Sequence, residues 1–408
     1  MKRILHSAVA FLASLAIGSQ LIRSADIYTA HEWGTFTTIS GSDGAALPWW
    51  TPTLEGPAVL PEFVQGVPSF RKTMAPSLMR METPVIYFYP MAPMSVSVGV
   101  DYPNGRLTEA FPSVNLQLPG AAPSSGARLP QYAWTVDLLP PTSINAEAMP
   151  PVKGRGAHYQ HAREVPEAWI VRGQASLNNT PKSPKQTEKF IFYRGTGGGT
   201  LPLTVMLTKD RSALVTSWTQ MTTDAYLIQI KDGAIRWRKA NVGFNQTQIQ
   251  KQTPIKIEAP DQSQDAEQLA AALRQTLIDA RLTEKEAAAM VATWTDAWLH
   301  EEGNRLLYLL PRSWIDSTLP LTLKPKPSKL ERVFVARAEL FSPEQEKRLA
   351  DVFRNSPSDD VLAKNLADLH VGRFAPAALE RVVRLNEKDL RDAFARVSAI
   401  AQNQKQPN

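Results

Sequence analysis

The sequence predicts an α+β protein, with an antiparallel, β-sandwich-like N-terminal domain followed by a smaller α-rich domain that has a few strands of its own. Two observations lead to this class. Up to about Ala259 the apolar residues come in short β-branched and aromatic runs, separated by Pro, Gly, Asn and Asp. After Ala259 the apolar residues recur at helical spacing. Strands first and helices later are typical of an α+β arrangement.

The early runs carry the strand pattern directly. In MSVSVGVDY the apolar residues from Met94 to Val100 alternate with serine and glycine, as expected of a half-buried strand. In YLIQIKDGAIRWRKA the dipeptide Asp232-Gly233 joins two alternating runs, which is a strong signal for a β-hairpin. Strands that recur in this way predict a sandwich or a related antiparallel architecture.

The later helices have recognisable beginnings. SQDAEQLAAALRQTLIDARL repeats leucine at helical spacing, and TEKEAAAMVATWTDAWLHEEGN opens with a capping box formed by Thr283 and Glu286. SPEQEKRLADVF begins with Ser342 as N-cap and Pro343 in the first turn. Two extended runs, RLLYLLP and LPLTLKP, lie between these helices. The second domain therefore has strands that either pack against the first sheet or complete it.

The N-terminal residues predict export. Lys2 and Arg3 precede a mostly apolar run that is too short to remain in a bilayer, and small residues follow near Gly18. We expect a signal peptide over residues 1–25, cleaved near 18–25, then domains at 26–259 and 260–402 and a disordered tail at 403–408. The mature chain is expected to be soluble, periplasmic or secreted, and without a stable membrane anchor.

The composition argues against several classes of protein. The chain of 408 residues contains no cysteine, so disulfides, lipid-modified cysteine anchors and thiol catalysis are excluded. Its net charge is +6, but Lys and Arg are interspersed with Asp and Glu, and no basic run carries aromatic residues. We therefore expect no nucleic-acid partner.

The stretch HEWGTFT places His31 directly beside Glu32. Neighbouring side chains on a strand point to opposite faces, and the second histidine of a helical zinc motif is missing here. Two interpretations of His31 remain. It is either a structural histidine that hydrogen-bonds a neighbouring loop, or one ligand of a divalent metal such as zinc with partners elsewhere. In the second case Glu32 is the candidate general base that activates a bound water.

Two other stretches supply candidate partners. GAHYQHARE, predicted as a loop, holds His158 and His161 two residues apart, with Arg163 beside them as a candidate ligand-binding residue. SLMRMETP places Arg80 and Glu82 ahead of a strand that reads as buried. For Glu82 a salt-bridged strand start is the default interpretation, and a carboxylate directed into a cleft is the alternative.

Adjacent tryptophans are the candidates for ligand stacking. Trp49 and Trp50 lie in the proline-rich stretch LPWWTPTLEGP. Buried packing is the commoner fate of tryptophan, but two neighbours in such a loop cannot both face inward easily. The pair therefore predicts a stacking surface for a ligand.

Five stretches resemble a family of exported bacterial proteins that is described only as uncharacterised or hypothetical. They are HEWGTFT, METPVIYFY, the pattern HYxxAR around His158, EKFIFYRG and TWTDAWLHEEGNRLLYLLPRSW. The likeness spans most of the mature chain and implies export and a two-part fold, but no particular activity. The family pattern at the third stretch includes His158 and Arg163 but not His161. It therefore favours His31, Glu82 and His158 as the metal set to test.

Two classes of function remain. The first is a non-catalytic exported module that binds a glycan, a peptide or a cell-envelope component and needs no cofactor. The second is a metal-assisted hydrolase that uses His31, Glu82 and His158 as ligands and Glu32 as the base. The first is preferred because no single motif holds a full set of metal ligands. The sequence leaves open whether the protein is an enzyme.

Overall fold

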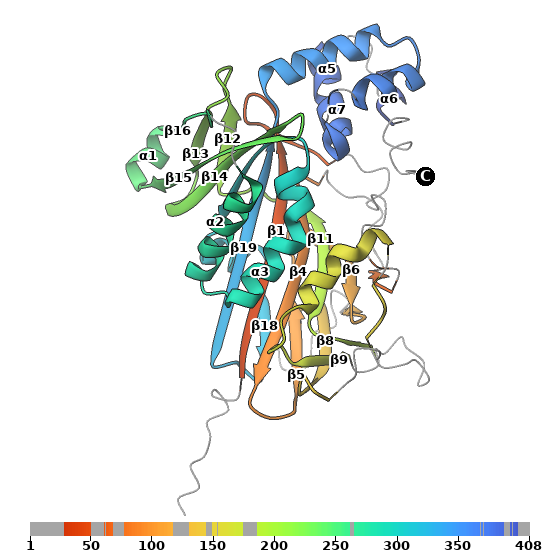
Figure 1. The fold of residues 1–408 in the computed structure, drawn as a ribbon, viewed down its shortest axis with the longest axis vertical. Helices are drawn as coiled ribbons and strands as arrows, with labels where there is room; N and C mark the ends of the chain where they lie inside the picture. The colour runs from red at the N-terminus through yellow and green to blue at the C-terminus, as the bar shows by residue number, and fades with distance from the viewer. Residues whose placement is uncertain are drawn as a thin grey trace, which may run out of the picture.

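The structure, a computed structural model, is α+β, with large antiparallel sheets and with its longer helices in the later part of the chain (Figure 1). The predicted signal peptide (1–25), Trp50 and the predicted tail (403–408) lie outside the described residues. The residues that the structure describes are 28–49, 61, 63–67, 77–116, 130–143, 149–152, 154–173, 186–261, 265–367, 369, 371–386, 392–393 and 395–398.

A ten-stranded sheet forms the centre of the molecule. Its neighbouring strands are antiparallel, apart from one parallel pair in which the first strand lies beside the last strand of the sequence. From one edge to the other the strands are β15 (Ala234–Phe244), β14 (Met221–Lys231), β17 (Gly303–Leu309), β19 (Lys329–Leu340), β1 (Tyr28–Ser40), β4 (Met79–Pro90), β11 (Ile191–Gly197), β6 (Gly105–Phe111) and β3 (Gln65–Gly66), with β2 (Ala46–Leu47) paired to β1.

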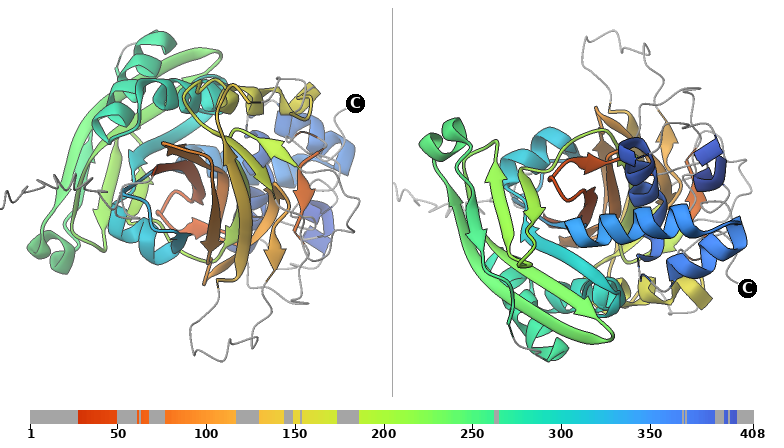
Figure 2. Two further views of the ribbon diagram at one scale, coloured as in Figure 1. Left: turned by 90° about the horizontal axis from the view of Figure 1, so that it is seen from below. Right: turned by 90° about the horizontal axis from the view of Figure 1, so that it is seen from above.

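Two smaller sheets pack on one face of the central sheet (Figure 2). Apolar side chains from all three sheets, among them Phe36, Val98 and Val215, form one core cluster. This is the β-sandwich-like packing that the strand pattern predicts. The strands of these sheets are β10 (Thr187–Glu188), β9 (Ile170–Gly173), β8 (Tyr132–Leu139), β5 (Met94–Val100) and β18 (Leu321–Lys324), with β7 (Asn115–Leu116) beside β8, and then β12 (Leu203–Leu207), β13 (Ala213–Ser217) and β16 (Ile255–Ile257).

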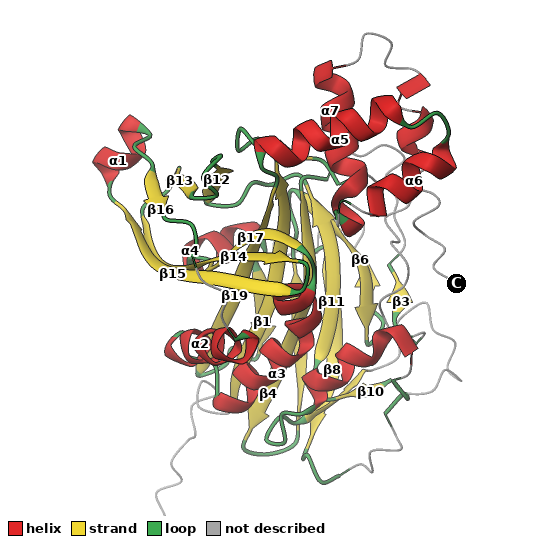
Figure 3. Ribbon diagram, turned by 45° about the horizontal axis from the view of Figure 1, so that its top comes forward, coloured by secondary structure: helices red, strands yellow, loops and turns green. Residues whose placement is uncertain are grey.

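Helices cover the other face of the central sheet and one of its ends (Figures 1 and 3). Trp33 and Val85 on that face pack against α2, α3 and η3, whereas Ile39 and Leu47 pack with α5 to α7 in a separate cluster at the end of the strands. The helices are η3 (Gly154–Arg163), α1 (Gln246–Lys251), α2 (Ala266–Asp279), α3 (Glu284–Thr295), η4 (Asp296–His300), α4 (Arg312–Thr318), α5 (Pro343–Asn355), α6 (Asp359–Ala367), η5 (Gly372–Phe374) and α7 (Ala375–Asn386).

The local signals in the sequence are confirmed. β14 and β15 form the predicted hairpin, and its turn residues Asp232 and Gly233 have φ of 53° and 73°, as a tight turn of this type requires. The capping boxes that begin α3 and α5 are both present. One local prediction is wrong, because the segment 154–163 forms the 3₁₀ helix η3 rather than a loop, with Tyr159 buried against the aromatic core.

The change of hydrophobic period near Ala259 does not separate two sheets. β17 and β19 both follow Ala259 in the sequence, yet they lie between β14 and β1 in the central sheet. Of the two expected arrangements, completion of the first sheet is the one observed for these strands. The predicted boundary at Ala259 therefore crosses a shared sheet.

Candidate functional site

His31 lies on β1 and is bonded to a residue of α3. Its Nδ1 is 2.9 Å from Oε2 of Glu286, and its ring packs edge-on against Tyr89. Glu286 also accepts hydrogen bonds from the Tyr89 hydroxyl (2.6 Å) and from the main chain of Thr283 (2.8 Å). Burial alone would raise the pKa of Glu286, but the bonds from His31 and Tyr89 hold it below its ordinary value. This geometry agrees with the structural interpretation of His31.

Glu32 points to the opposite face of β1 from His31, as the alternation of a strand requires. Its fully buried carboxylate accepts hydrogen bonds from the Tyr193 hydroxyl and from Nε of Arg332. Arg332 is held in turn by Asp316 at 2.8 Å. The prediction of Glu32 as a general base beside His31 is therefore wrong in this structure, since the two side chains lie on different faces.

Glu82 is part of a chain of buried ion pairs. Its carboxylate accepts hydrogen bonds from the Thr37 hydroxyl (2.6 Å) and from Arg373 of η5 (2.7 Å), and it lies 3.6 Å from Nε of Arg80. The default interpretation, a salt-bridged strand start, is therefore the one observed. Burial opposes the ionisation of Glu82, but the charges of Arg373 and Arg80 outweigh it and lower the pKa to about 2.

The ion pairs continue beyond Arg373. Arg373 lies 3.8 Å from Glu301, which binds Arg337 at 2.7 Å, and Glu339 joins Arg337 (2.9 Å) to Arg305 (3.3 Å). Arg305, Arg337 and Glu339 are buried. We call this set the buried ion-pair chain, and its members are Glu82, Arg373, Glu301, Arg337, Glu339 and Arg305.

The three predicted metal ligands do not meet. In the β1–β4 ladder His31 lies opposite Tyr87, whereas Glu82 lies five positions further along β4, opposite Thr35. At roughly 3.3 Å per residue this separation is on the order of 15 Å, which is beyond the reach of one ion. His158 belongs to a third element, η3. The prediction of one site from His31, Glu82 and His158 is therefore wrong here, and no group of three or more His, Asp or Glu among the described residues could hold a metal ion.

The remaining predicted ligand-binding residues are enclosed by the fold. Arg163 binds Glu188 through two nitrogens, with Nη2 to Oε2 at 2.6 Å, and also bonds the carbonyl of Pro150. Trp49 is 8% exposed, donates to the Thr37 carbonyl, and has the guanidinium groups of Arg80 and Arg373 within about 6 Å of its ring. Neither side chain is presented to a ligand, so both predictions are corrected, and Trp50 lies outside the described residues.

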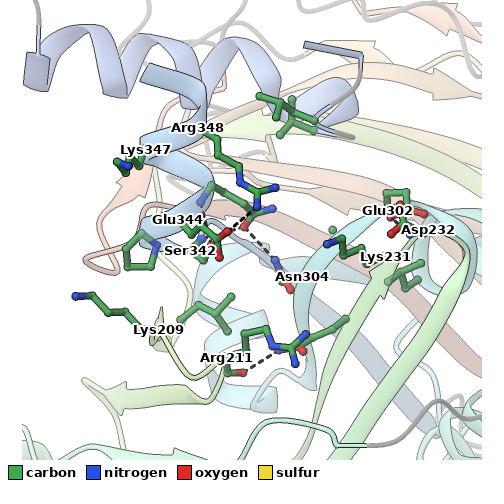
Figure 4. Close-up of a pocket in the computed structure, with 18 of the residues that line it drawn as sticks. Lys209, Arg211, Lys231, Asp232, Glu302, Asn304, Ser342, Glu344, Lys347 and Arg348 are labelled. Carbon is green, nitrogen blue, oxygen red and sulfur yellow. Dashed lines mark hydrogen bonds and ion pairs between the residues drawn. The ribbon is translucent and has the colours of Figure 1, made fainter. Parts of the chain in front are cut away.

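An open cavity of about 760 Å³ lies between the central sheet and α5. A volume in this range, roughly 300–1,000 Å³, is typical of ligand sites. Its walls include the turn between β12 and β13, the hairpin of β14 and β15, the start of β17, and the first turns of α5 (Figure 4). The segment that precedes η5 closes a further side through Leu369 and Val371.

The lining of the cavity is strongly basic. Its six cations exceed its three acids (Asp232, Glu302 and Glu344) by three charges. Glu344 is paired with Arg348 at 2.6 Å, and Glu302 accepts hydrogen bonds from the main chain of Asp232 and Gly233. The other five cations have no ion-pair partner among the described residues: Lys209, Arg211, Lys231, Arg236 and Lys347.

The turn between β12 and β13 holds two of these cations in place. The main-chain N–H of Arg211 donates to the carbonyl of Thr208, and Arg211 adopts a left-handed φ of 65°. Lys209 and Arg211 are both exposed and lie on one side of the cavity, with the amine of Lys209 directed outward, while Lys347 and Arg348 of α5 lie on the other side (Figure 4). An anion between them would be attracted from several directions at once.

The sequence did not reveal this cavity. Its cations come from three segments that are each typical of a solvated turn or helix surface, and no local pattern indicates that they meet. The one partial signal is the predicted Asp232-Gly233 hairpin, because it places Lys231 and Arg236 at the same end of two strands. The sequence predicts Glu286 only as a capping residue, although its carboxylate also binds His31.

Comparison with solved structures gives a distant structural likeness. No protein-family model and no curated protein matches the chain. The chain is similar to the Fcho1 Mu homology domain of Danio rerio, solved with a bound Eps15 peptide, at a TM-score of 0.30 and 10% sequence identity, over 78% of this chain and 98% of that one. A likeness this distant assigns no function to the chain. Among the described residues, no helix has both the length and the apolar composition needed to cross a bilayer.

Proposed function

We propose that this protein is an exported, non-catalytic binding module that holds an anionic ligand in the basic cavity between the central sheet and α5. The observation that carries the proposal is the set of five unpaired cations around a cavity of about 760 Å³. A cluster of like charges without partners costs stability, and an anionic ligand would offset that cost. The predicted class of binding module is thereby retained, with the ligand site moved from the Trp49 region to this cavity.

The alternative of a metal-assisted hydrolase has no comparable support. His31 and Glu82 each have their own protein partners and lie on the order of 15 Å apart along the sheet. Glu32, the proposed base, faces away from His31 and is bound to Arg332.

Titration calorimetry with small probes of known charge tests the proposal. We expect the full-length mature chain to bind tetragalacturonate or a capped pentaglutamate, and not to bind neutral maltotetraose. The double variant Lys209→Gln/Lys347→Gln should weaken binding of the anionic probes roughly fivefold, since each exposed charge contributes on the order of 0.5 kcal/mol. Both side chains are exposed, so the fold should not change.

A matched control uses two exposed lysines away from the cavity, Lys285 and Lys326. The variant Lys285→Gln/Lys326→Gln removes the same net charge and should leave the affinity within twofold of the parent. Equal loss in both double variants, or equal binding of maltotetraose, would show that the cavity is not a specific anion site.

Export is a separate part of the proposal. Cells that make the full chain should yield a shortened product outside the cytoplasm, with its first residue between Ser19 and Asp26. N-terminal sequencing of the periplasmic and secreted fractions measures this directly. An uncleaved product in the cytoplasm would contradict it.

A further inference from the structure

The floor of the cavity holds two carboxamides side by side. Gln229 of β14 and Asn304 of β17 are directly opposite in the antiparallel ladder, so their side chains share one face, and both line the cavity. Nε2 of Gln229 donates to the carbonyl of Arg211 at 2.8 Å, and Nδ2 of Asn304 donates to Oε1 of Gln345 at 3.1 Å. Each amide nitrogen therefore uses one of its two N–H groups within the protein.

The side-chain oxygens of Gln229 and Asn304, in contrast, accept no hydrogen bond from the described residues. Gln229 is 4% exposed, and its Oε1 is buried without a hydrogen-bond donor among the described residues. The Oδ1 of Asn304 accepts no hydrogen bond from the described residues either. A buried acceptor without a donor is costly, so a ligand that fits this floor brings N–H or O–H groups to it.

The rest of the lining distinguishes between classes of anionic ligand. None of the described residues that line the cavity is aromatic, so the stacking platforms that sugar rings use are missing. Aliphatic side chains are present instead, and the two that are partly exposed, Pro343 and Leu369, suit the side chains of a peptide. The aliphatic residues of the lining are Leu207, Ile230, Pro343, Leu369 and Val371.

We propose that the ligand of this cavity is an acidic peptide segment with interspersed aliphatic residues. Its carboxylates pair with the unpaired cations at the rim, its main-chain N–H groups donate to the oxygens of Gln229 and Asn304, and its aliphatic side chains pack on the partly exposed Pro343 and Leu369. This inference rests on the proposed function, because it names the class of anion that the cavity holds.

Three probes test the inference in calorimetric titrations at one fixed salt concentration. The first is a capped pentapeptide of alternating glutamate and valine, the second is the same peptide with its amides N-methylated, and the third is tetragalacturonate. We expect the unmodified peptide to bind at least fivefold more tightly than either of the others. N-methylation removes the N–H donors without changing the charge.

Two variants test whether the effect of N-methylation depends on the residues at the floor of the cavity. Gln229→Met removes the unpaired oxygen while keeping the volume, so the difference between the unmodified and N-methylated peptides should shrink to less than twofold. Because Gln229 is buried and also holds the Arg211 carbonyl, Asn304→Leu at a half-buried position serves as the second variant. Asn304→Leu should also reduce the difference in affinity between the unmodified and the N-methylated peptide.

The outcomes separate the two proposals. If no anionic probe binds, the proposed function fails and the peptide assignment fails with it. If tetragalacturonate binds as tightly as the peptide, or if N-methylation leaves the affinity unchanged, the peptide assignment is overturned while an anion-binding cavity stands. Preferential binding of the unmodified peptide, with an N-methylation effect that depends on Gln229 or Asn304, supports both.

Discussion

The carboxylate of Glu286 has three donors, and the imidazole of His31 is one of them. His31→Ala would leave this buried group with fewer partners, so we expect the free energy of unfolding to fall by about 1–3 kcal/mol. Urea denaturation at neutral pH measures the change. His161→Ala is the matched control, because His161 is more exposed and its partner Glu164 is at the surface. A His31→Ala protein as stable as the control would show that the His31–Glu286 bond contributes nothing.

Gly34 lies at a close approach between β1, which carries the motif HEWGTFT, and β4, which carries METPVIYFY. β4 bulges at Glu82, Thr83 and Pro84, where Thr83 has a φ of 52°, and the bulge brings Pro84 onto Gly34 of β1. A Cβ added to Gly34 would lie 2.9 Å from Cα of Pro84 and 2.7 Å from Cε1 of Phe334. HEWGTFT therefore needs a glycine at this position because METPVIYFY bends toward it.

Gly34→Ala should consequently destabilise the protein by about 1–3 kcal/mol, through overpacking against the rigid Pro84 main chain. Gly66→Ala is the control, since the nearest atom to its added Cβ would be 4.0 Å away. Thermal unfolding of the two variants compares them. A smaller loss for Gly34→Ala than for Gly66→Ala would contradict the proposed close approach.

Between elements, the buried ion-pair chain attaches the C-terminal helices to the sheet. Arg373 of η5 reaches Glu82 of β4 and Glu301 after η4. The same segments also border the cavity, because Glu302 and Val371 line it while their near neighbours Glu301 and Arg373 belong to the chain of ion pairs. Loss of these pairs should therefore loosen one wall of the cavity as well as destabilise the fold.

The pH dependence of stability should report this attachment. The pKa of Glu82 falls from its ordinary value of 4.5 to about 2 in the folded protein, so its contribution is present above about pH 4.5 and is lost as the pH falls toward 2. That pKa shift corresponds to about 3 kcal/mol in the free energy of unfolding. Stability curves from urea denaturation between pH 2 and pH 7 should be steep in this window for the parent and flatter for Glu82→Gln.

Glu344→Gln is the control for this experiment, because Glu344 pairs with Arg348 at an exposed position. It should leave both the stability at pH 7 and its pH dependence nearly unchanged. Hydrogen exchange in α5 to α7 should be faster in Glu82→Gln than in Glu344→Gln. Equal exchange in the two variants would show that the Glu82–Arg373 pair does not hold these helices.

At the scale of the whole molecule, the strand-patterned part of the sequence before Ala259 and the helix-patterned part after it contribute strands to the same sheet. β19 pairs with β1 along twelve positions, from Thr29 with Lys329 to Ser40 with Leu340, and β17 pairs with β14. We therefore expect that proteolysis between Ala259 and Asp265 leaves two pieces that co-elute in size-exclusion chromatography and separate only in denaturant. Two pieces that separate in native buffer and keep their secondary structure would contradict the shared sheet.

The strands, the hairpin at Asp232-Gly233 and the capping boxes of α3 and α5 could be predicted because their signals lie within a few residues of each other. The parallel pairing of β1 with β19 could not, since the two strands are about 300 residues apart and hydrophobic period does not specify a partner. The same limit applies to the site. Lys209 and Lys347 each read as solvated surface until the fold brings their segments to one cavity.

A crystal structure of the protein with the capped glutamate–valine peptide would show whether the basic cavity is the ligand site. We expect density for the peptide between the β12–β13 turn and α5, with carboxylates near Lys209, Arg211 or Lys347 and main-chain nitrogens near Oε1 of Gln229. Peptide bound elsewhere on the molecule, with this cavity filled only by water, would contradict it.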